Sequence, residues 1–144
     1  MNPTFIFVDG SYYCFYRYFA LLQWWKNAYP EEIDILQDPY QNPKFVDKFK
    51  KTFVSNVQKI VNNLNILNPI IIVGKDCKRE QIWRNKLFAN YKANRANGQE
   101  DGFMGGPFFK MAYEAELFQK GGAKAILKHP RLEADDCIAI SVKY

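Results

Sequence analysis

The sequence predicts an α/β protein with a mostly parallel central sheet flanked by helices. Two short, continuous apolar runs support this class, residues 5–8 (Phe-Ile-Phe-Val) and residues 70–73 (Ile-Ile-Ile-Val). Apolar runs of this length, without alternating polar residues, are typical of strands that are buried on both faces, as in parallel sheets. A long amphipathic segment separates the two runs. Strand, helix and strand in this order predict a right-handed crossover between two adjacent parallel strands.

Length and composition fit one domain that covers residues 1–144. A chain of 144 residues that is 48% hydrophobic can bury one core. No secretory signal is seen, and no apolar run approaches the roughly 20 residues that cross a bilayer. Three cysteines without a C-x-x-C pair indicate a reducing compartment, so we expect an intracellular protein without a membrane partner. The single histidine, His129, excludes sites that need two, and the net charge of +5 favours a polyanionic partner.

The remaining elements follow from periodicity and from helix breakers. Residues 12–26 lack Gly and Pro and predict a helix, whereas the three prolines of residues 27–43 predict an irregular connection. Apolar residues at helical spacing predict a long helix over residues 44–67. Further helices are expected over residues 78–91, over residues 107–121 after Pro107, and from residue 134 onward. Residues 124–128 predict a third strand.

Acidic residues stand where ligands bind in such folds. Asp9 follows the first strand and Asp76 follows the second, and the carboxyl ends of parallel strands form the usual site of chemistry. Both acids are therefore expected at one edge of the sheet. Asp9 is also suited to capping the following helix, which is the purely structural alternative.

A third acidic stretch begins the last helix, with Glu133, Asp135 and Asp136 within four residues. Acidic residues suit a helix N-terminus because the peptide dipole favours negative charge there. Three carboxylates so close together also repel one another, and a divalent cation with oxygen ligands relieves this repulsion. The pattern alone leaves both interpretations open.

Aromatic and basic residues are mixed in two of the predicted helices. Aromatic faces can stack on nucleic-acid bases, and Arg and Lys can pair with phosphates. Packing in the core and snorkelling over its edge are the structural alternatives. The candidates for nucleic-acid contact are Tyr13, Tyr16, Arg17, Arg79, Tyr91, Lys92 and Arg95.

Taken together, these motifs resemble the flap endonuclease and 5′-to-3′ exonuclease family, which includes the 5′-nuclease domain of bacterial DNA polymerase I. The matching pieces are residues 7–11 (Phe-Val-Asp-Gly-Ser), 74–76 (Gly-Lys-Asp), 83–84 (Trp-Arg), 91–95 (Tyr-Lys-Ala-Asn-Arg) and 133–136 (Glu-Ala-Asp-Asp). Each piece is weak alone, but their order and spacing are specific. The resemblance implies a PIN-like 5′-nuclease fold that hydrolyses DNA with a single-stranded 5′ end or flap.

The resemblance also implies roles for single residues. Two Mg²⁺ or Mn²⁺ ions in the complete enzyme would be held, directly or through water, by Asp9, Asp76, Glu133, Asp135 and Asp136. Two such ions, about 3.5–4 Å apart, activate a water and stabilise the leaving oxygen of an in-line displacement. Lys92 and Arg95 would contact the scissile phosphate, with Arg84 on the same path. Residues 94–121 would form a mobile arch over the 5′ end.

The chain departs from the family pattern at two points. Tyr16, followed by Arg17, stands where the family carries an arginine after the first Asp-Gly pair. The chain also ends within the helix that follows the acidic stretch, so we expect a truncated fold, with a separate C-terminal fragment as a partner that completes it. We accordingly expect the isolated chain to be a poor nuclease. The alternatives are a PIN-like ribonuclease that acts on RNA, and a non-catalytic DNA-binding subunit or half of a split nuclease.

Overall fold

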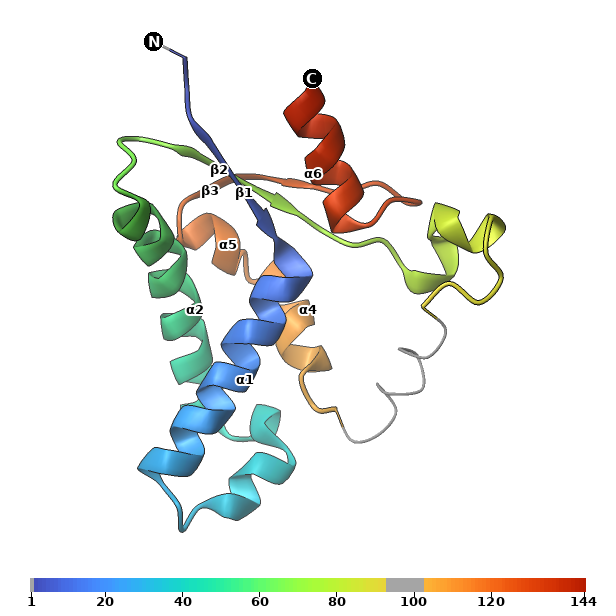
Figure 1. Ribbon diagram of the computed structural model, residues 1–144. Coiled ribbons are helices and arrows are strands. Elements are labelled where there is room, and N and C mark those ends of the chain that lie inside the picture. The colour runs from blue at the N-terminus through green and yellow to red at the C-terminus, as the bar shows by residue number, and fades with distance from the viewer. Residues whose placement is uncertain (1, 93–102) are drawn as a thin grey trace.

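A three-stranded parallel sheet organises the chain, which we describe from a computed structural model for residues 2–92 and 103–144 (Figure 1). Strands β1 (Phe5–Asp9), β2 (Ile70–Gly74) and β3 (Ala123–Leu127) lie side by side in that order. The register pairs Asp9 with Gly74 and Gly74 with Leu127, so the carboxyl ends of all three strands meet at one edge. The predicted α/β class and the parallel pairing of the first two strands are confirmed.

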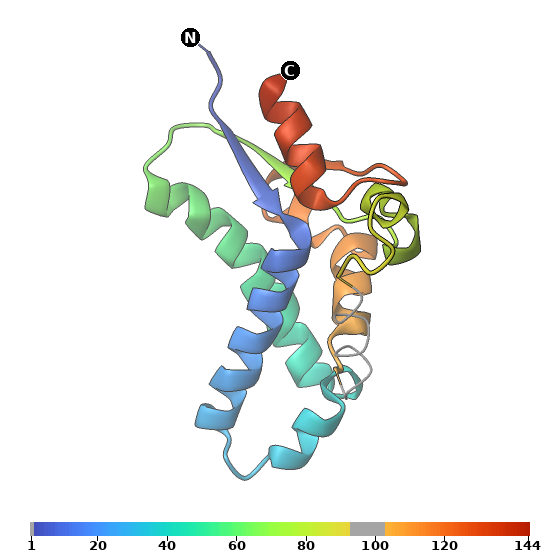
Figure 2. The same ribbon diagram turned by 45° about the vertical axis from the view of Figure 1, so that its right-hand side comes forward.

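Helices cover the two faces of the sheet unequally. Helices α1 (Gly10–Ala28), α2 (Pro43–Leu64), α4 (Gly106–Glu114) and α5 (Leu117–Lys120) lie on one side, and α6 (Ala134–Lys143) lies on the other (Figures 1 and 2). The core fills the thicker side. Its largest fully buried side chains include Phe45, Phe49 and Phe53 of α2 and Phe108 of α4.

Helix α2 shows why the local sequence folds as predicted. The Asn42 side chain accepts a hydrogen bond from the Lys44 N–H, and Pro43 occupies the first turn, where no backbone donor is needed. Apolar residues at helical spacing then face the core. The helix ends at Leu64, three residues earlier than the predicted limit, and its C-cap Asn65 has a left-handed φ of 53°. Two 3₁₀ turns, η1 (Ile33–Gln37) and η2 (Pro39–Gln41), form the irregular connection before it.

The prediction of a helix over residues 78–91 is wrong. The segment forms two short 3₁₀ turns, η3 (Arg79–Gln81) and η4 (Trp83–Lys86), separated by Ile82, whose ψ of 127° is not helical. Ile82 is buried, and the Trp83 N–H donates to the Arg131 carbonyl at 2.9 Å. These tertiary contacts outweigh helix propensity, which is worth only a few tenths of a kcal/mol per residue, roughly.

The helix predicted over residues 107–121 is interrupted. Helix α4 ends at Glu114, and Glu116 adopts a left-handed φ of 55° before the short helix α5 begins. The interruption turns the chain so that Phe108 and Phe118 both enter the core. Within the part of the chain that the structure describes, no helix is both long and apolar enough to cross a membrane.

Candidate metal centre

Three aspartates from three elements converge at the carboxyl edge of the sheet. Asp9 ends β1, Asp76 follows β2, and Asp135 lies in the first turn of α6. All three line one cleft of about 990 Å³, together with Glu133 and Lys92. The sequence-based expectation that Asp9 and Asp76 share one edge is confirmed, and α6 adds the third carboxylate.

Backbone N–H groups hold the first two aspartates in place. Asp9 Oδ1 accepts the Tyr12 N–H at 3.1 Å and so caps α1. Asp76 Oδ1 accepts the Ala134 N–H at 2.6 Å, which joins the end of β2 to the start of α6. Among the described residues, Asp135 and Asp76 Oδ2 accept no hydrogen bond, whereas the backbone of Ser11, like that of Tyr12, hydrogen-bonds to Asp9. Asp76 and Asp135 therefore each have an oxygen available for a ligand, and Asp9 shares its oxygens with two backbone groups.

Gly74 makes this arrangement possible. A Cβ atom at this position would lie 2.8 Å from the Ala134 carbonyl oxygen and 3.1 Å from Cγ1 of Ile138. Real Cβ atoms do not approach backbone so closely, so any side chain here would push α6 away from β2. Because Gly74 has none, the Ala134 N–H can reach Asp76.

The charges at the cleft repel one another. Partial burial raises the pKa of Asp9, although much of its side chain is exposed, and the negative charges of Asp76 and Asp135 raise it further. The hydrogen bond from Tyr12 opposes this rise. A divalent cation would relieve the repulsion, and carboxylate oxygens are the ligands that Mg²⁺ and Mn²⁺ prefer. The three aspartates thus have the donor chemistry for a hard divalent ion, although their oxygens do not all lie within 4.8 Å of one another.

Glu133 is engaged by cations. Its side chain is nearly buried, and its Oε1 accepts hydrogen bonds from Arg84 Nη1 at 3.0 Å and from the Tyr91 hydroxyl at 2.8 Å. Its Oε2 accepts from Lys92 Nζ at 2.9 Å. Burial alone would raise the pKa of Glu133, but the hydrogen bonds from Lys92 and Tyr91 outweigh burial and lower it. Glu133 is therefore a neutralised carboxylate at the wall of the cleft.

Asp136 is held still more completely. Its Oδ1 accepts from Arg84 Nη2 at 2.6 Å, and its Oδ2 accepts from Arg84 Nη1 at 2.8 Å, from Trp83 Nε1 at 3.2 Å and from the Glu133 N–H at 3.1 Å. The last of these bonds belongs to a capping box at the start of α6. The hydrogen bonds from Arg84 are the main reason that the pKa of Asp136 is lowered.

The distances between carboxylate oxygens alone favour a different set of metal ligands. One oxygen each from Glu133, Asp135 and Asp136 lies within 4.8 Å of the others. Two of these carboxylates already neutralise Arg84 and Lys92, so this trio has little charge left for an ion. The set with available oxygens is Asp9, Asp76 and Asp135, and Glu133 can join it only by releasing Lys92.

The predicted basic residues have different positions. Lys92 lines the cleft and has a left-handed φ of 50°, which is uncommon for a residue other than glycine. Arg79 also lines the cleft, and its Nη2 donates to the Tyr91 carbonyl at 3.3 Å. Arg84 was expected near a phosphate, but its guanidinium is paired with the carboxylates of Glu133 and Asp136. Arg95 lies outside the described residues.

The predicted arch is only partly described. Residues 93–102 lie outside the described part of the chain, whereas the rest of the segment forms α4 and α5. Phe108, Leu117 and Phe118 are at most 2% exposed. Helices α4 and α5 are therefore anchored in the core through these three side chains, and the mobile arch over residues 94–121 stays a prediction.

The aromatic candidates on α1 divide between core and surface. Tyr13 is packed in the core, where its hydroxyl donates to the Phe53 carbonyl at 2.6 Å, so it leaves the set of nucleic-acid contacts. Tyr16 is 56% exposed, and the Arg17 guanidinium lies 4.6 Å from its ring centre. Tyr12 was not among the predicted contacts, yet it is 70% exposed and lines the cleft with Phe15. Its position three residues after Asp9, one helical turn on, was the available signal.

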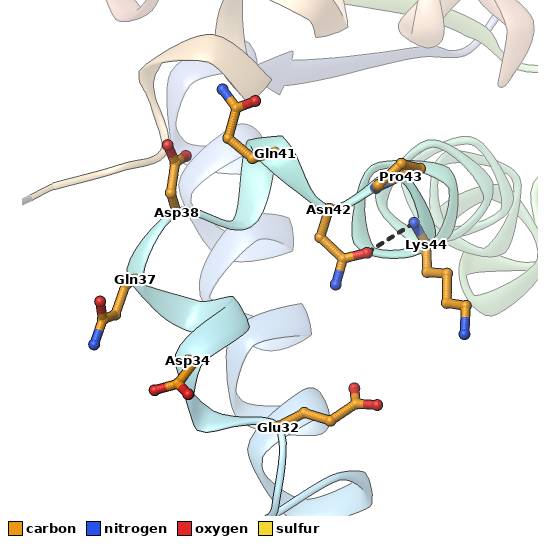
Figure 3. Close-up of a pocket in the computed structure, with 8 residues that line it drawn as sticks. All are labelled: Glu32, Asp34, Gln37, Asp38, Gln41, Asn42, Pro43 and Lys44. Atoms are coloured by element: carbon orange, nitrogen blue, oxygen red, sulfur yellow. Dashed lines mark hydrogen bonds between the residues drawn. The ribbon is translucent and has the colours of Figure 1, made fainter.

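A second hollow, of about 800 Å³, lies at the far end of α1 and is lined by residues of η1, of η2 and of the start of α2 (Figure 3). Figure 3 shows Asn42 turned toward the Lys44 N–H, which is the capping bond of α2. Asp34 and Asp38 extend separately from the ribbon and do not converge. This hollow therefore has a structural explanation, and the chemistry concentrates at the sheet edge.

No family model, curated protein or solved structure matches the chain. Its function is therefore inferred from the geometry of the cleft.

Proposed function

We propose that this protein is a divalent-metal-dependent nuclease of the 5′-nuclease type, which hydrolyses phosphodiester bonds of DNA at the cleft. The observation that carries the proposal is the convergence of Asp9, Asp76 and Asp135 from three elements in one cleft with Lys92. The resemblance of the sequence motifs to 5′-nucleases favours DNA with a single-stranded 5′ end or flap as the substrate.

The carboxylates would hold Mg²⁺ or Mn²⁺. Asp9, Asp76 and Asp135 supply the available oxygens for one ion, and a second ion, as in the resembling family, would draw on Glu133 after Lys92 has left it. A bound divalent ion supplies an activated water and stabilises the charge that develops on the phosphoryl oxygens.

Basic residues at the cleft would hold the substrate's phosphates. Lys92 and Arg79 both line the cleft and carry positive charge toward the acids. Because phosphate and carboxylate compete for the same ammonium group, a phosphate that enters the cleft can take Lys92 from Glu133. The net charge of +5 favours association with a polyanion in general.

Aromatic side chains form another part of the wall. Tyr12 and Phe15 on α1 line the cleft together with Phe103 and Phe109. Aromatic faces stack on unpaired bases irrespective of sequence, and stacking is worth about 1–3 kcal/mol per base. A single-stranded nucleic acid with its phosphates toward Lys92 and a base against Tyr12 suits this wall.

Cleavage assays with labelled oligonucleotides test the proposal. We expect the wild-type protein to cleave 5′-flap or single-stranded DNA with MgCl₂ or MnCl₂ and not with EDTA, and Asp76→Asn to abolish this cleavage. Asp47→Asn is the matched control, because Asp47 is an exposed acid on α2 that pairs with Lys51. Equal metal-dependent cleavage by wild type and Asp76→Asn would overturn the proposal.

The same assay separates the alternatives. Cleavage of RNA in preference to every DNA substrate would indicate a PIN-like ribonuclease. Salt-sensitive DNA binding, with no cleavage at any metal concentration, would indicate a non-catalytic binding subunit, and the engagement of Glu133 by Lys92 is the observation that favours this outcome.

A further inference from the structure

Arg84 makes an unusual number of contacts with acids for a residue that was expected to meet phosphate. Its two terminal nitrogens bind the two oxygens of Asp136, at 2.6 Å and 2.8 Å, in a bidentate arrangement. Nη1 also donates to Glu133, and the guanidinium carbon lies 4.6 Å from the ring centre of Trp83. A planar guanidinium that is paired on one edge and stacked on one face is held rigidly.

Both oxygens of Asp136 are likewise occupied by hydrogen bonds. Its two oxygens accept four hydrogen bonds, from Trp83, from Glu133 and twice from Arg84. A metal ion could take this carboxylate only by displacing a bidentate cation and a capping bond. The side chains of Arg84 and Asp136 are only 25% and 13% exposed, so water screens the pair weakly.

The pair connects two parts of the fold that are distant in sequence. Through Trp83 and Arg84 it holds η4, and through the Glu133 N–H it holds the first turn of α6. The next N–H of α6, that of Ala134, is bound by Asp76. The first turn of α6 is thus fixed at two points, and Asp135 follows directly after them.

We propose that Arg84 is a positioning residue and that Asp136 is its anchor. Together with Trp83 they form a brace that aims Asp135 and Glu133 at the cleft, and neither Arg84 nor Asp136 contacts the metal or the substrate phosphate. This inference depends on the proposed function at one point only, since the carboxylates that the brace positions belong to the proposed metal site.

A double-mutant cycle tests the pairing without metal. Wild type, Arg84→Gln, Asp136→Asn and the double variant are unfolded with urea in EDTA. We expect each single variant to raise the unfolding equilibrium constant about tenfold. The free energy of unfolding of the double variant should be no lower than that of the less stable single variant. Arg84→Lys, which keeps the charge but loses the fork, should fall between wild type and Arg84→Gln and provides a second variant should Arg84→Gln not fold. Additive effects would overturn the brace.

Mn²⁺ binding, followed by electron paramagnetic resonance, tests whether Asp136 is a ligand. Asp136→Asn keeps an oxygen that can accept the Glu133 N–H and so keeps the direction of Asp135, and we expect its Kd for Mn²⁺ to stay within about threefold of wild type. Arg84→Gln releases both Glu133 and Asp136 from the guanidinium and should weaken Mn²⁺ binding by more than threefold if the brace aims these carboxylates. Asp76→Asn is the ligand control and should weaken binding at least tenfold. A loss with Asp136→Asn as large as that with Asp76→Asn would overturn the assignment of Asp136.

Binding of single-stranded DNA, measured against salt in EDTA, tests whether Arg84 is a phosphate contact. Each lost phosphate contact lowers the slope of log K against log salt by about 0.7. We expect Arg84→Gln to leave this slope unchanged and Lys92→Gln to lower it. A decrease with Arg84→Gln would overturn the positioning role.

The brace and the proposed function can fail separately. If the wild-type protein binds no Mn²⁺, the proposed function fails, and the urea cycle in EDTA still decides the brace. If Mn²⁺ binds and Asp76→Asn abolishes binding while the cycle is additive, the brace fails and the proposed function stands.

Discussion

Lys92 Nζ lies 2.9 Å from Glu133 Oε2, so a cation of the cleft and its least exposed carboxylate neutralise each other across 41 residues of sequence. The hydrogen bond to Glu133 raises the pKa of Lys92, which keeps the side chain charged. Because Lys92 occupies Glu133 Oε2, this oxygen is not available to a metal ion. At the proposed metal site, metal binding and the Lys92 contact would therefore compete for one carboxylate.

Lys92→Met should strengthen metal binding. Without the competing ammonium group, Glu133 can turn to the ion, and we expect the Kd for Mn²⁺ to fall about fivefold, which corresponds to about 1 kcal/mol. Electron paramagnetic resonance of free Mn²⁺ measures the change. Lys110→Met is the control, because Lys110 is exposed on α4 and pairs only loosely with Glu114 at 3.7 Å. An unchanged Kd in Lys92→Met would show that Glu133 takes no part in metal binding.

The same substitution should weaken nucleic-acid binding without regard to sequence. An ammonium group that meets phosphates contributes the same energy to every base composition. We expect Lys92→Met to lower the affinity for several oligonucleotides by similar factors and to flatten the salt dependence, with fluorescence anisotropy as the measurement. A loss confined to one base composition would contradict a phosphate contact.

Gly74→Ala should damage the site more than the fold. The new Cβ would meet the Ala134 carbonyl at 2.8 Å and would push α6 away from Asp76. We expect a loss of about 1–3 kcal/mol in the free energy of unfolding, together with at least a tenfold weaker Mn²⁺ affinity. Gly106→Ala is the matched control, since a Cβ there meets nothing within 4 Å. Equal Mn²⁺ affinity in the two variants would contradict the close approach of α6.

Removing a carboxylate of the proposed metal site should reduce the proposed cleavage and leave the fold intact. We expect Asp135→Asn to reduce metal-dependent cleavage at least about 100-fold, or about 2.7 kcal/mol in activation free energy. Because Asp135 repels Asp9, its loss should leave the metal-free protein equally stable or slightly more stable. Thermal melting in EDTA measures the stability, and strong destabilisation with retained cleavage would mean that Asp135 is only structural.

Acid should destabilise the metal-free protein through Asp136. Hydrogen bonds from Arg84 lower the pKa of Asp136 below its ordinary value of 3.8, so the folded protein holds this proton less tightly than the unfolded chain. The stabilisation is complete above the unfolded pKa and is lost as the pH falls through the folded pKa. Urea unfolding in EDTA, from pH 6 down to about pH 3, should show this loss in wild type. The slope should be shallower in Asp136→Asn, and identical slopes would contradict the prediction.

The positions of Asp9 and Asp76 could be predicted because local patterns determine them. Each follows a continuous apolar run, and a parallel crossover brings the two strand ends to one edge. The start of α6 was also local, since its capping box joins residues three positions apart.

Local patterns could not predict which acids are paired with cations and which remain available for a ligand. Asp136 meets Trp83 across 53 residues, and Glu133 meets Arg84 across 49, so no periodicity within either segment signals the contact. The same contacts explain why residues 78–91 do not form the predicted helix. A continuous helix would align the side chains at its own spacing, whereas η3 and η4 place Ile82 in a buried position and Arg84 on the carboxylates.

The sequence by itself determined the α/β class, the three strands and the two aspartates at their ends, because strand burial and helix periodicity are properties of contiguous residues. Only the tertiary structure decided which carboxylates remain available for a cation. Lys92, Arg84 and Tyr91 reach Glu133 and Asp136 through the folding of a non-helical segment against α6, and the neutralisation of a charge depends on distance in space and not on position in the chain.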